Sequence, residues 1–423
     1  MNDVAPITLR LRRAAASPWF ILAAVMLVAA ALRVPGLERF VESRIGTPCC
    51  TLGGDEAYTL RIAMQPLDTI LGLPDGGNNW ILYLFAHFWL QLIGAPTNVG
   101  LRIVPLALSL ASLPAAYLAL REMVRVIAPR TWLGADRVAL IGTALLAVHP
   151  MHIFYATQFR TPSAVVLLAA CTTYLAARMV GAAQRGAPPS MRAWLLLGVA
   201  HGAGIYLHML SATYWVALVA MILSMAPLMR REVRLQLVRG AVVSGVAVAI
   251  VAARLLVAAA QVGTKQISWI GPLDPPQMAT FATRYLGGGV LRADYLENLP
   301  AAIVVSLLVG GLVLLGRVAA ARAIPRSDRR AQWGWFAPLL LAGVPPLLGC
   351  AISLAITPVL LPRYFISLLV PVALLFALAV DTLGGRVSAA RRHRTTRALL
   401  LVAWLVAILI AMVAGYWSPP IES

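Results

Sequence analysis

The stretch WFILAAVMLVAAAL occupies residues 19–32, and it follows Arg10, Arg12 and Arg13. An apolar run of this kind behind a cluster of arginines is typical of a first membrane span. No small-residue cleavage site follows it convincingly, so we interpret it as an uncleaved span rather than a secretory signal. This segment predicts that the chain enters a membrane directly after its N-terminus.

The composition of all 423 residues also indicates a membrane protein, because 60% are apolar and only 12% are charged. Soluble domains carry about 25% charged residues, so most of this surface must meet lipid or other helices. The net charge of +19 falls in short loops between apolar segments, and we therefore predict no nucleic-acid partner. The pattern predicts an all-α polytopic membrane protein of about eleven transmembrane helices, at 19–35, 100–120, 138–155, 162–180, 193–209, 211–228, 240–260, 299–316, 334–356, 364–383 and 398–416.

Basic residues predict which way the chain crosses the membrane. With the N-terminus in the cytoplasm, 24 of the 35 basic residues fall inside and ten outside, and Arg254 lies within a span. This follows the rule that cytoplasmic loops are rich in arginine, and it places the C-terminus on the extracytoplasmic side of the membrane. Residues 79–94 are apolar too. A span there would place the arginine clusters at 121–137 and 386–397 on the outer side, against the same rule, so we predict a helix on the outer surface. The predicted location is the bacterial inner membrane.

Two predicted outer segments, 36–99 and 261–298, are longer than ordinary connections and are therefore expected to be functional. Neither is long enough to form a core of its own, so we predict one transmembrane domain over 1–423. The first segment is expected to form surface helices, one of them over 57–71. The second contains Gly287, Gly288 and Gly289 and is predicted to be a flap. No soluble C-terminal domain is expected after the eleventh span.

The first outer segment contains Gly53-Gly54-Asp55-Glu56-Ala57-Tyr58. Two adjacent carboxylates follow two glycines that allow the backbone to bend. One interpretation is a catalytic acid pair at the outer membrane surface. The other is an ordinary helix start, where acidic residues are favoured by the helix dipole. The residues alone leave both interpretations open.

Four further segments follow the acid pair, each near the outer end of a predicted span: GLRIVP at 100–105, HPMHIFYATQFR at 149–160, GIYLH at 204–208 and LPRY at 361–364. In this order they resemble the GT-C glycosyltransferases, specifically the group of protein O-mannosyltransferases and the lipid A aminoarabinose transferase. The resemblance covers 19–383 loosely. The chain departs from the family pattern at 76–79 and at 158–160, which leaves the donor and the acceptor open.

The resemblance implies inverting transfer of a hexosyl or pentosyl group from a polyprenyl-phosphate donor, on the extracytoplasmic face. The acceptor would be a lipid, a glycan or a protein, and membrane lipids would surround the enzyme. Asp55 matches the catalytic base of the family, and Glu56 is the predicted helper. The departing phosphate requires cationic groups, and the planar fork of arginine suits phosphate oxygens. We predict that Arg102, Arg160 and Arg363 bind the donor phosphate, although snorkelling to the interface would also explain each of them.

Other side chains at similar depth are candidate ligands. No HxH or HExxH spacing occurs, so a tight zinc site is not indicated, whereas a loosely held divalent metal cation at Asp55, Glu56 and His208 stays open. No other cofactor is expected. The predicted substrate-binding residues are Tyr58, Gln158, His208, Trp269, Tyr285 and Tyr364.

Two alternative functions fit the same outline. A membrane transporter or lipid flippase would bury charge near the bilayer midplane, but Arg254 is the only strongly charged residue well inside a predicted span, and no inverted repeat is visible. A pyrophosphate-linked oligosaccharide ligase would share the architecture and differ in its donor.

Overall fold

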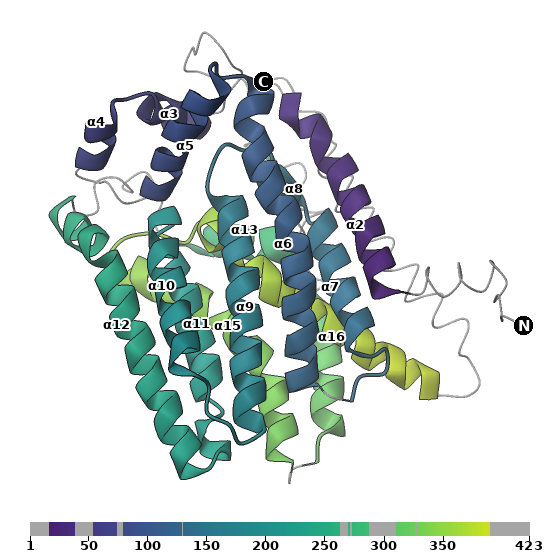
Figure 1. The fold of residues 1–423 in the computed structure, drawn as a ribbon. Coiled ribbons are helices and arrows are strands. Elements are labelled where there is room, and N and C mark those ends of the chain that lie inside the picture. The colour runs from purple at the N-terminus through teal and green to yellow at the C-terminus, as the bar shows by residue number, and fades with distance from the viewer. Residues whose placement is uncertain are drawn as a thin grey trace, which may run out of the picture.

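The computed structural model describes residues 17–38, 54–73, 79–128, 130–262, 270, 273–286, 310–325 and 328–389. Every regular element in these ranges is a helix, and the helices form a bundle with a smaller group of helices over one end (Figure 1). Seven described helices are long and apolar enough to cross a membrane, or eight if one bent pair forms a single span. The prediction of an all-α polytopic membrane protein is confirmed.

Most predicted spans correspond to helices. Span 193–209 is α10 (Met191–Leu207). Span 299–316 is described only from residue 310, and 398–416 lies outside the described residues. The long spanning elements are α2 (Pro18–Arg33) with η1 (Val34–Glu38), α6 (Asn98–Ile127), α9 (Pro162–Gln184), α11 (Ser211–Leu223) with η2 (Ala226–Leu228), α12 (Arg231–Val262), α15 (Arg329–Ala355), and η4 (Pro362–Leu368) with α16 (Leu369–Ala389).

The span predicted as one helix over 138–155 is broken. It consists of α7 (Ala135–Val148) and α8 (Pro150–Ala156), which are bent by 58°. Pro150 causes the break, because a residue before proline is pushed out of the helical region. His149 accordingly has an extended conformation, with φ −66° and ψ 123°. The bend redirects the chain into the connection at 157–161 that precedes α9.

The helix predicted over 57–71 is also two helices, α3 (Gly54–Ala63) and α4 (Leu67–Gly72), because Pro66 lacks the N–H needed to continue α3. The segment at 79–94 forms α5 (Trp80–Ile93), whose 14 residues extend about 21 Å, short of the roughly 30 Å of a hydrocarbon core. Helices α3 and α4 both pack on α5, at the same end of the bundle (Figure 1). Asp55 therefore lies in a cap over the spanning helices.

Small residues let the spanning helices pack closely. Helices α6 and α9 form the central pair, with Ala116 and Ala119 of α6 and Ala169 and Ala176 of α9 all buried. Helices α10 and α12 also lie side by side, and a Cβ atom on Gly198 would stand 2.4 Å from the backbone oxygen of Ser244. Such close approach is how helices associate in lipid, where burial of apolar side chains gives little driving force.

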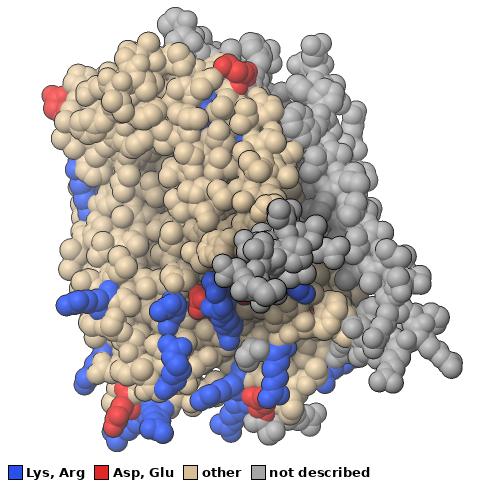
Figure 2. Space-filling view, turned by 45° about the vertical axis from the view of Figure 1, so that its right-hand side comes forward, with Lys and Arg blue, Asp and Glu red and all other residues tan. Residues whose placement is uncertain are grey.

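The two ends of the bundle carry different charges. Figure 2 shows arginine side chains gathered at one end and few at the other. Arg102 and Arg125 lie at opposite ends of α6, and Arg160 and Arg185 flank α9, so the acid pair and the arginine-rich end are on opposite sides. The side of the membrane that each end faces stays a prediction. The arginine-rich end includes Arg121, Arg125, Arg137, Arg178, Arg185, Arg192, Arg231, Arg234 and Arg330.

Candidate active site

Asp55 lies in the first turn of α3 with its side chain 51% exposed. Its Oδ2 accepts a hydrogen bond from Nη1 of Arg363 at 2.9 Å, and Nη2 of Arg160 lies 3.6 Å away. Nη1 of Arg160 also donates to the backbone carbonyl of Asp55 at 3.0 Å. Two of the three arginines predicted to bind phosphate therefore meet at the predicted base. Arg160 is 105 residues from Asp55 in the sequence, and Arg363 is 308 residues from it.

Glu56 is in a different environment, with only 2% of its surface exposed. Arg102, 1% exposed, donates through Nε to Oε1 at 3.3 Å and through Nη2 to Oε2 at 3.2 Å. The N–H of Phe159 donates to the same Oε1 at 2.8 Å, and Nη1 of Arg102 donates to the carbonyl of Leu37 at 3.2 Å. This buried pair joins α3 to α6, to η1 and to the α8–α9 connection. Arg102 thus pairs with Glu56 in the interior, whereas Arg160 and Arg363 meet Asp55.

Arg363 is held at the start of η4. The hydroxyl of Tyr285, on α13 (Pro275–Leu286), donates to the carbonyl of Pro362, so the residue before Arg363 is anchored. The guanidinium of Arg363 lies over the ring of Tyr364, 5.5 Å from its centroid, and the Tyr364 ring is 4.7 Å from that of His208. A continuous row of side chains thus runs from Asp55 to His208.

His208 follows the last residue of α10 and precedes α11, outside both helices. Burial, followed by the positive charges of Arg160 and Arg363, lowers the pKa of His208 to about 3. The imidazole is therefore neutral at physiological pH. Its Nδ1 accepts a hydrogen bond from the N–H of Leu210 at 3.3 Å, so the ring proton is on Nε2 and can be donated to a ligand.

The remaining predicted ligand residues are less centrally placed. Tyr58 is exposed on α3 beneath the guanidinium of Arg61, which lies 5.4 Å from the ring centroid. Gln158 is partly buried in the connection between α8 and α9. Tyr285 is buried, and its hydroxyl serves the backbone below Arg363. Trp269 lies outside the described residues, as do the glycines of the predicted flap.

The predicted metal ligands lie beside cationic side chains. Within the described part of the chain, no three His, Cys, Asp or Glu side chains gather as metal ligands would. Both carboxylate oxygens of Glu56 face the Arg102 guanidinium, and Oδ2 of Asp55 faces two more guanidiniums. The carboxylates of Asp55 and Glu56 thus have cationic partners in this structure, and a divalent metal at Asp55, Glu56 and His208 stays a prediction.

Three contributors to the site were not predicted. Thr59 donates through Oγ1 to the carbonyl of Asp55 at 3.0 Å and accepts from Nη1 of Arg160 at 3.3 Å. Its position one helical turn after Asp55 was a usable signal, because residues four apart share a helix face. The N–H of Phe159 and the carbonyl of Leu37 are backbone groups, and no side-chain pattern points to them.

No family model and no curated protein sequence matches the chain. Solved structures of the oligosaccharyltransferase from the archaeon Archaeoglobus fulgidus do match its fold. The protein named AglB, in complex with an inhibitory peptide and a dolichol-phosphate, has a TM-score of 0.56 and 14% identity, over 96% of this chain and 56% of that chain. The form tethered to an acceptor peptide with the NVT sequon has a TM-score of 0.53 and 14% identity, over 96% and 55%.

The complex with Zn and sulfate has a TM-score of 0.54 and 14% identity, over 95% and 54%. The chain thus spans a little over half the length of the solved structures it matches. AglB is a GT-C fold enzyme, so the chain has the GT-C fold that its motifs predicted. At this identity the likeness concerns the fold alone.

Proposed function

We propose that this protein is an inverting glycosyltransferase that uses a polyprenyl-phosphate sugar at the end of the bundle that carries Asp55. The observation that carries the proposal is the Asp55 carboxylate with Arg363 and Arg160 beside it, at the end opposite the arginine-rich surface. The GT-C fold supports it, and one structure of similar fold holds a dolichol-phosphate, a lipid of the proposed donor class. The positive-inside rule assigns this end to the extracytoplasmic face.

The reaction is written as a single displacement. The acceptor oxygen attacks the anomeric carbon, the bond from that carbon to the phosphate oxygen breaks, and its electron pair leaves with the phosphate. Asp55 takes the proton of the acceptor hydroxyl. Arg363 and Arg160 stabilise the charge that develops on the phosphate, as bidentate guanidinium contacts do. Before the donor binds, the same guanidiniums hold Asp55, and the phosphate takes over their donors and leaves the carboxylate facing the acceptor.

The neighbouring residues have separate proposed roles. Glu56 and Arg102 position α3 and do not touch substrate, because they are paired and buried. The Nε2–H of His208 is directed to a hydroxyl or phosphate oxygen of the ligands. Tyr364 packs between His208 and Arg363 and orders both. Tyr58, Gln158 and Trp269 stay candidate contacts for the sugar or the acceptor.

A divalent cation is a separate question. One structure of similar fold is a complex with Zn and sulfate. When bound near a leaving phosphate, such an ion would neutralise its charge. In this chain the guanidiniums of Arg363 and Arg160 already stand beside Asp55 with that function. The reaction above is therefore written with the two arginines, and a bound divalent cation would add to their positive charge.

The second candidate function is ligation of an oligosaccharide from a pyrophosphate-linked lipid. The similarity in fold to an oligosaccharyltransferase favours it over a transporter. A transporter is further disfavoured by Arg254, which donates to the carbonyl of Leu71 and lies 5.2 Å from the ring centroid of Trp80. Both partners belong to the capping helices, so this charge is near the Asp55 end and not at the midplane.

The test compares glycolipids and glycoproteins from cells with and without the gene, by mass spectrometry. A glycan that is absent from cells without the gene should return when they receive the wild-type gene. It should also return with the matched control Asp68→Asn, which changes an exposed carboxylate on α4. It should not return with Asp55→Asn. Purified protein is then given the sugar on a polyprenyl phosphate or on a polyprenyl pyrophosphate, which separates the two candidate functions. Restoration of the glycan by Asp55→Asn would refute the proposed base.

A further inference from the structure

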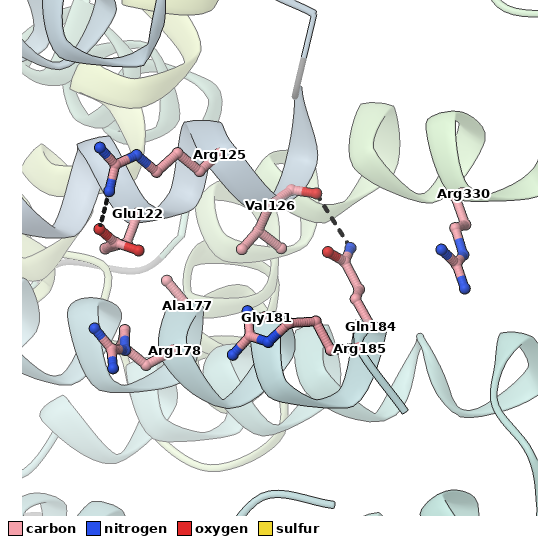
Figure 3. Close-up of a pocket in the computed structure, with 9 residues that line it drawn as sticks. All are labelled: Glu122, Arg125, Val126, Ala177, Arg178, Gly181, Gln184, Arg185 and Arg330. Atoms are coloured by element: carbon pink, nitrogen blue, oxygen red, sulfur yellow. Dashed lines mark hydrogen bonds and ion pairs between the residues drawn. The ribbon is translucent and has the colours of Figure 1, made fainter. Parts of the chain in front are cut away.

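A cavity of about 600 Å³ opens at the arginine-rich end, between α6, α9 and α15. Figure 3 shows the residues that line it, which include Glu122 and Arg125 from α6, Arg178, Gly181 and Arg185 from α9, and Arg330 from α15. This end is opposite the Asp55 site. The cavity therefore has no part in the chemistry proposed there, and an inference about it stands apart from that proposal.

The cavity has an excess of positive charge. Arg125 donates through Nη1 to Oε1 of Glu122 at 2.7 Å, which neutralises one of its four arginines. Arg178, Arg185 and Arg330 have no carboxylate partner among the described residues, so three positive charges face one opening. In Figure 3 the Arg185 side chain turns back along α9 toward Gly181. A Cβ atom there would lie 3.4 Å from its Nη1.

We propose that this cavity binds the phosphate head group of an anionic phospholipid, best one with two phosphates such as cardiolipin. Unpaired guanidiniums offer the bidentate donors that phosphate oxygens accept. The three helices that line the cavity continue into apolar spans, and α15 exposes Phe336 six residues after Arg330, which gives an acyl chain apolar surface to lie on. A soluble phosphate compound would not use that surface. Basic pockets between spanning helices are known sites for such head groups.

The experiment measures binding of cardiolipin to the purified full chain in detergent, by native mass spectrometry over a lipid titration. The test variant is Arg178→Gln with Arg185→Gln. The matched control is Arg231→Gln with Arg234→Gln, which removes the same charge at the same end, from the start of α12, outside the cavity. Each arginine is expected to contribute about fivefold, so the cavity variant should bind about 30-fold more weakly. The control should change binding by less than about threefold.

Two results would overturn the proposal. Equal weakening by the cavity pair and the control pair would mean that the lipid responds only to the overall positive field. Inorganic pyrophosphate that competes as strongly as cardiolipin would assign the cavity to a soluble ligand. Melting curves without added lipid check that both variants fold. If the double variant does not fold, Arg330→Gln tests the same cavity from α15, with an expected loss of about fivefold.

Discussion

Asp55 and Glu56 are neighbours in sequence, yet we expect neutralisation of each to have opposite consequences. Asp55→Asn and Glu56→Gln make the same chemical change, a carboxylate to its amide, with nearly the same shape. Asp55 is half exposed beside Arg363, whereas Glu56 is buried in a bidentate pair with Arg102. Asp55→Asn should abolish catalysis without a loss of stability. Glu56→Gln should mainly lower the stability of the fold.

The expected stability loss follows from burial. Glu56→Gln leaves the guanidinium of Arg102, only 1% exposed, without its counter-ion, and loss of one partner from a buried pair costs about 3–5 kcal/mol. Asp55→Asn breaks the ion pairs with Arg160 and Arg363, whose side chains are 20% and 32% exposed, and the Asp55 side chain itself is 51% exposed. Exposed ion pairs contribute about 1 kcal/mol or less. Asp55→Asn should therefore melt close to the wild-type protein.

The expected activity loss runs the other way. Asp55→Asn removes the proposed base, and a positioned base contributes about 10²–10⁴ in rate. Glu56→Gln should lose less activity per folded molecule than Asp55→Asn at low temperature, because it keeps the base and alters only the position of α3, where a ~1 Å misplacement costs about 100-fold. Thermal melting in detergent and single-turnover transfer from a radiolabelled polyprenyl-phosphate sugar measure the two quantities.

A double replacement separates a positioning role from a chemical one. Glu56→Leu with Arg102→Met removes both buried charges and should recover much of the stability that Glu56→Gln loses, since apolar pairs replace buried ion pairs at little cost. The outcome that would refute the reasoning is a reversal. If Glu56→Gln were stable and inactive while Asp55→Asn were unstable and active, Glu56 would be the base.

Three further results are expected. Arg363→Ala should raise the Kd for donor at least about 10-fold and Arg363→Lys should recover part of it, since lysine keeps the charge and loses the fork; unchanged affinity in titrations would exclude the phosphate role. His208→Asn should lower the rate but leave the pH–rate profile unshifted between pH 5 and 8, because its pKa of about 3 keeps the ring neutral throughout; a shifted profile would contradict this. Gly198→Leu should lower stability by about 1–3 kcal/mol in chemical denaturation, since its Cβ meets the backbone oxygen of Ser244; an unchanged midpoint would refute the close packing.

The sequence predicted the membrane bundle well, because apolar length and arginine placement are properties of local stretches. The errors came where proline interrupts an apolar or mixed stretch. Residues 138–155 and 57–71 satisfied composition for single helices, but Pro150 and Pro66 break them. Hydropathy counts a proline as an ordinary residue, whereas the backbone loses a hydrogen-bond donor there.

The site was predictable as a set of side chains but not as a geometry. Order along the chain brought Asp55, Arg160 and Arg363 into one prediction, and the structure brings them into contact. The sequence did not distinguish Arg102 from the other two arginines, since all three lie at the same depth. What separates them is burial against Glu56, which depends on how α3 lies on α6. Backbone partners such as the N–H of Phe159 depend on the same tertiary arrangement.

The Glu56–Arg102 pair has a consequence for which parts of the site can move when a donor binds. It fastens the helix that carries Asp55 to η1, α6 and the α8–α9 connection at once. The turn that carries Arg363 is fixed as well, because Phe365 and Ile366 are buried and Tyr285 holds the carbonyl of Pro362. We therefore expect donor binding to move the side chains of Arg363 and Arg160 while the backbone around Asp55 and Arg363 stays in place.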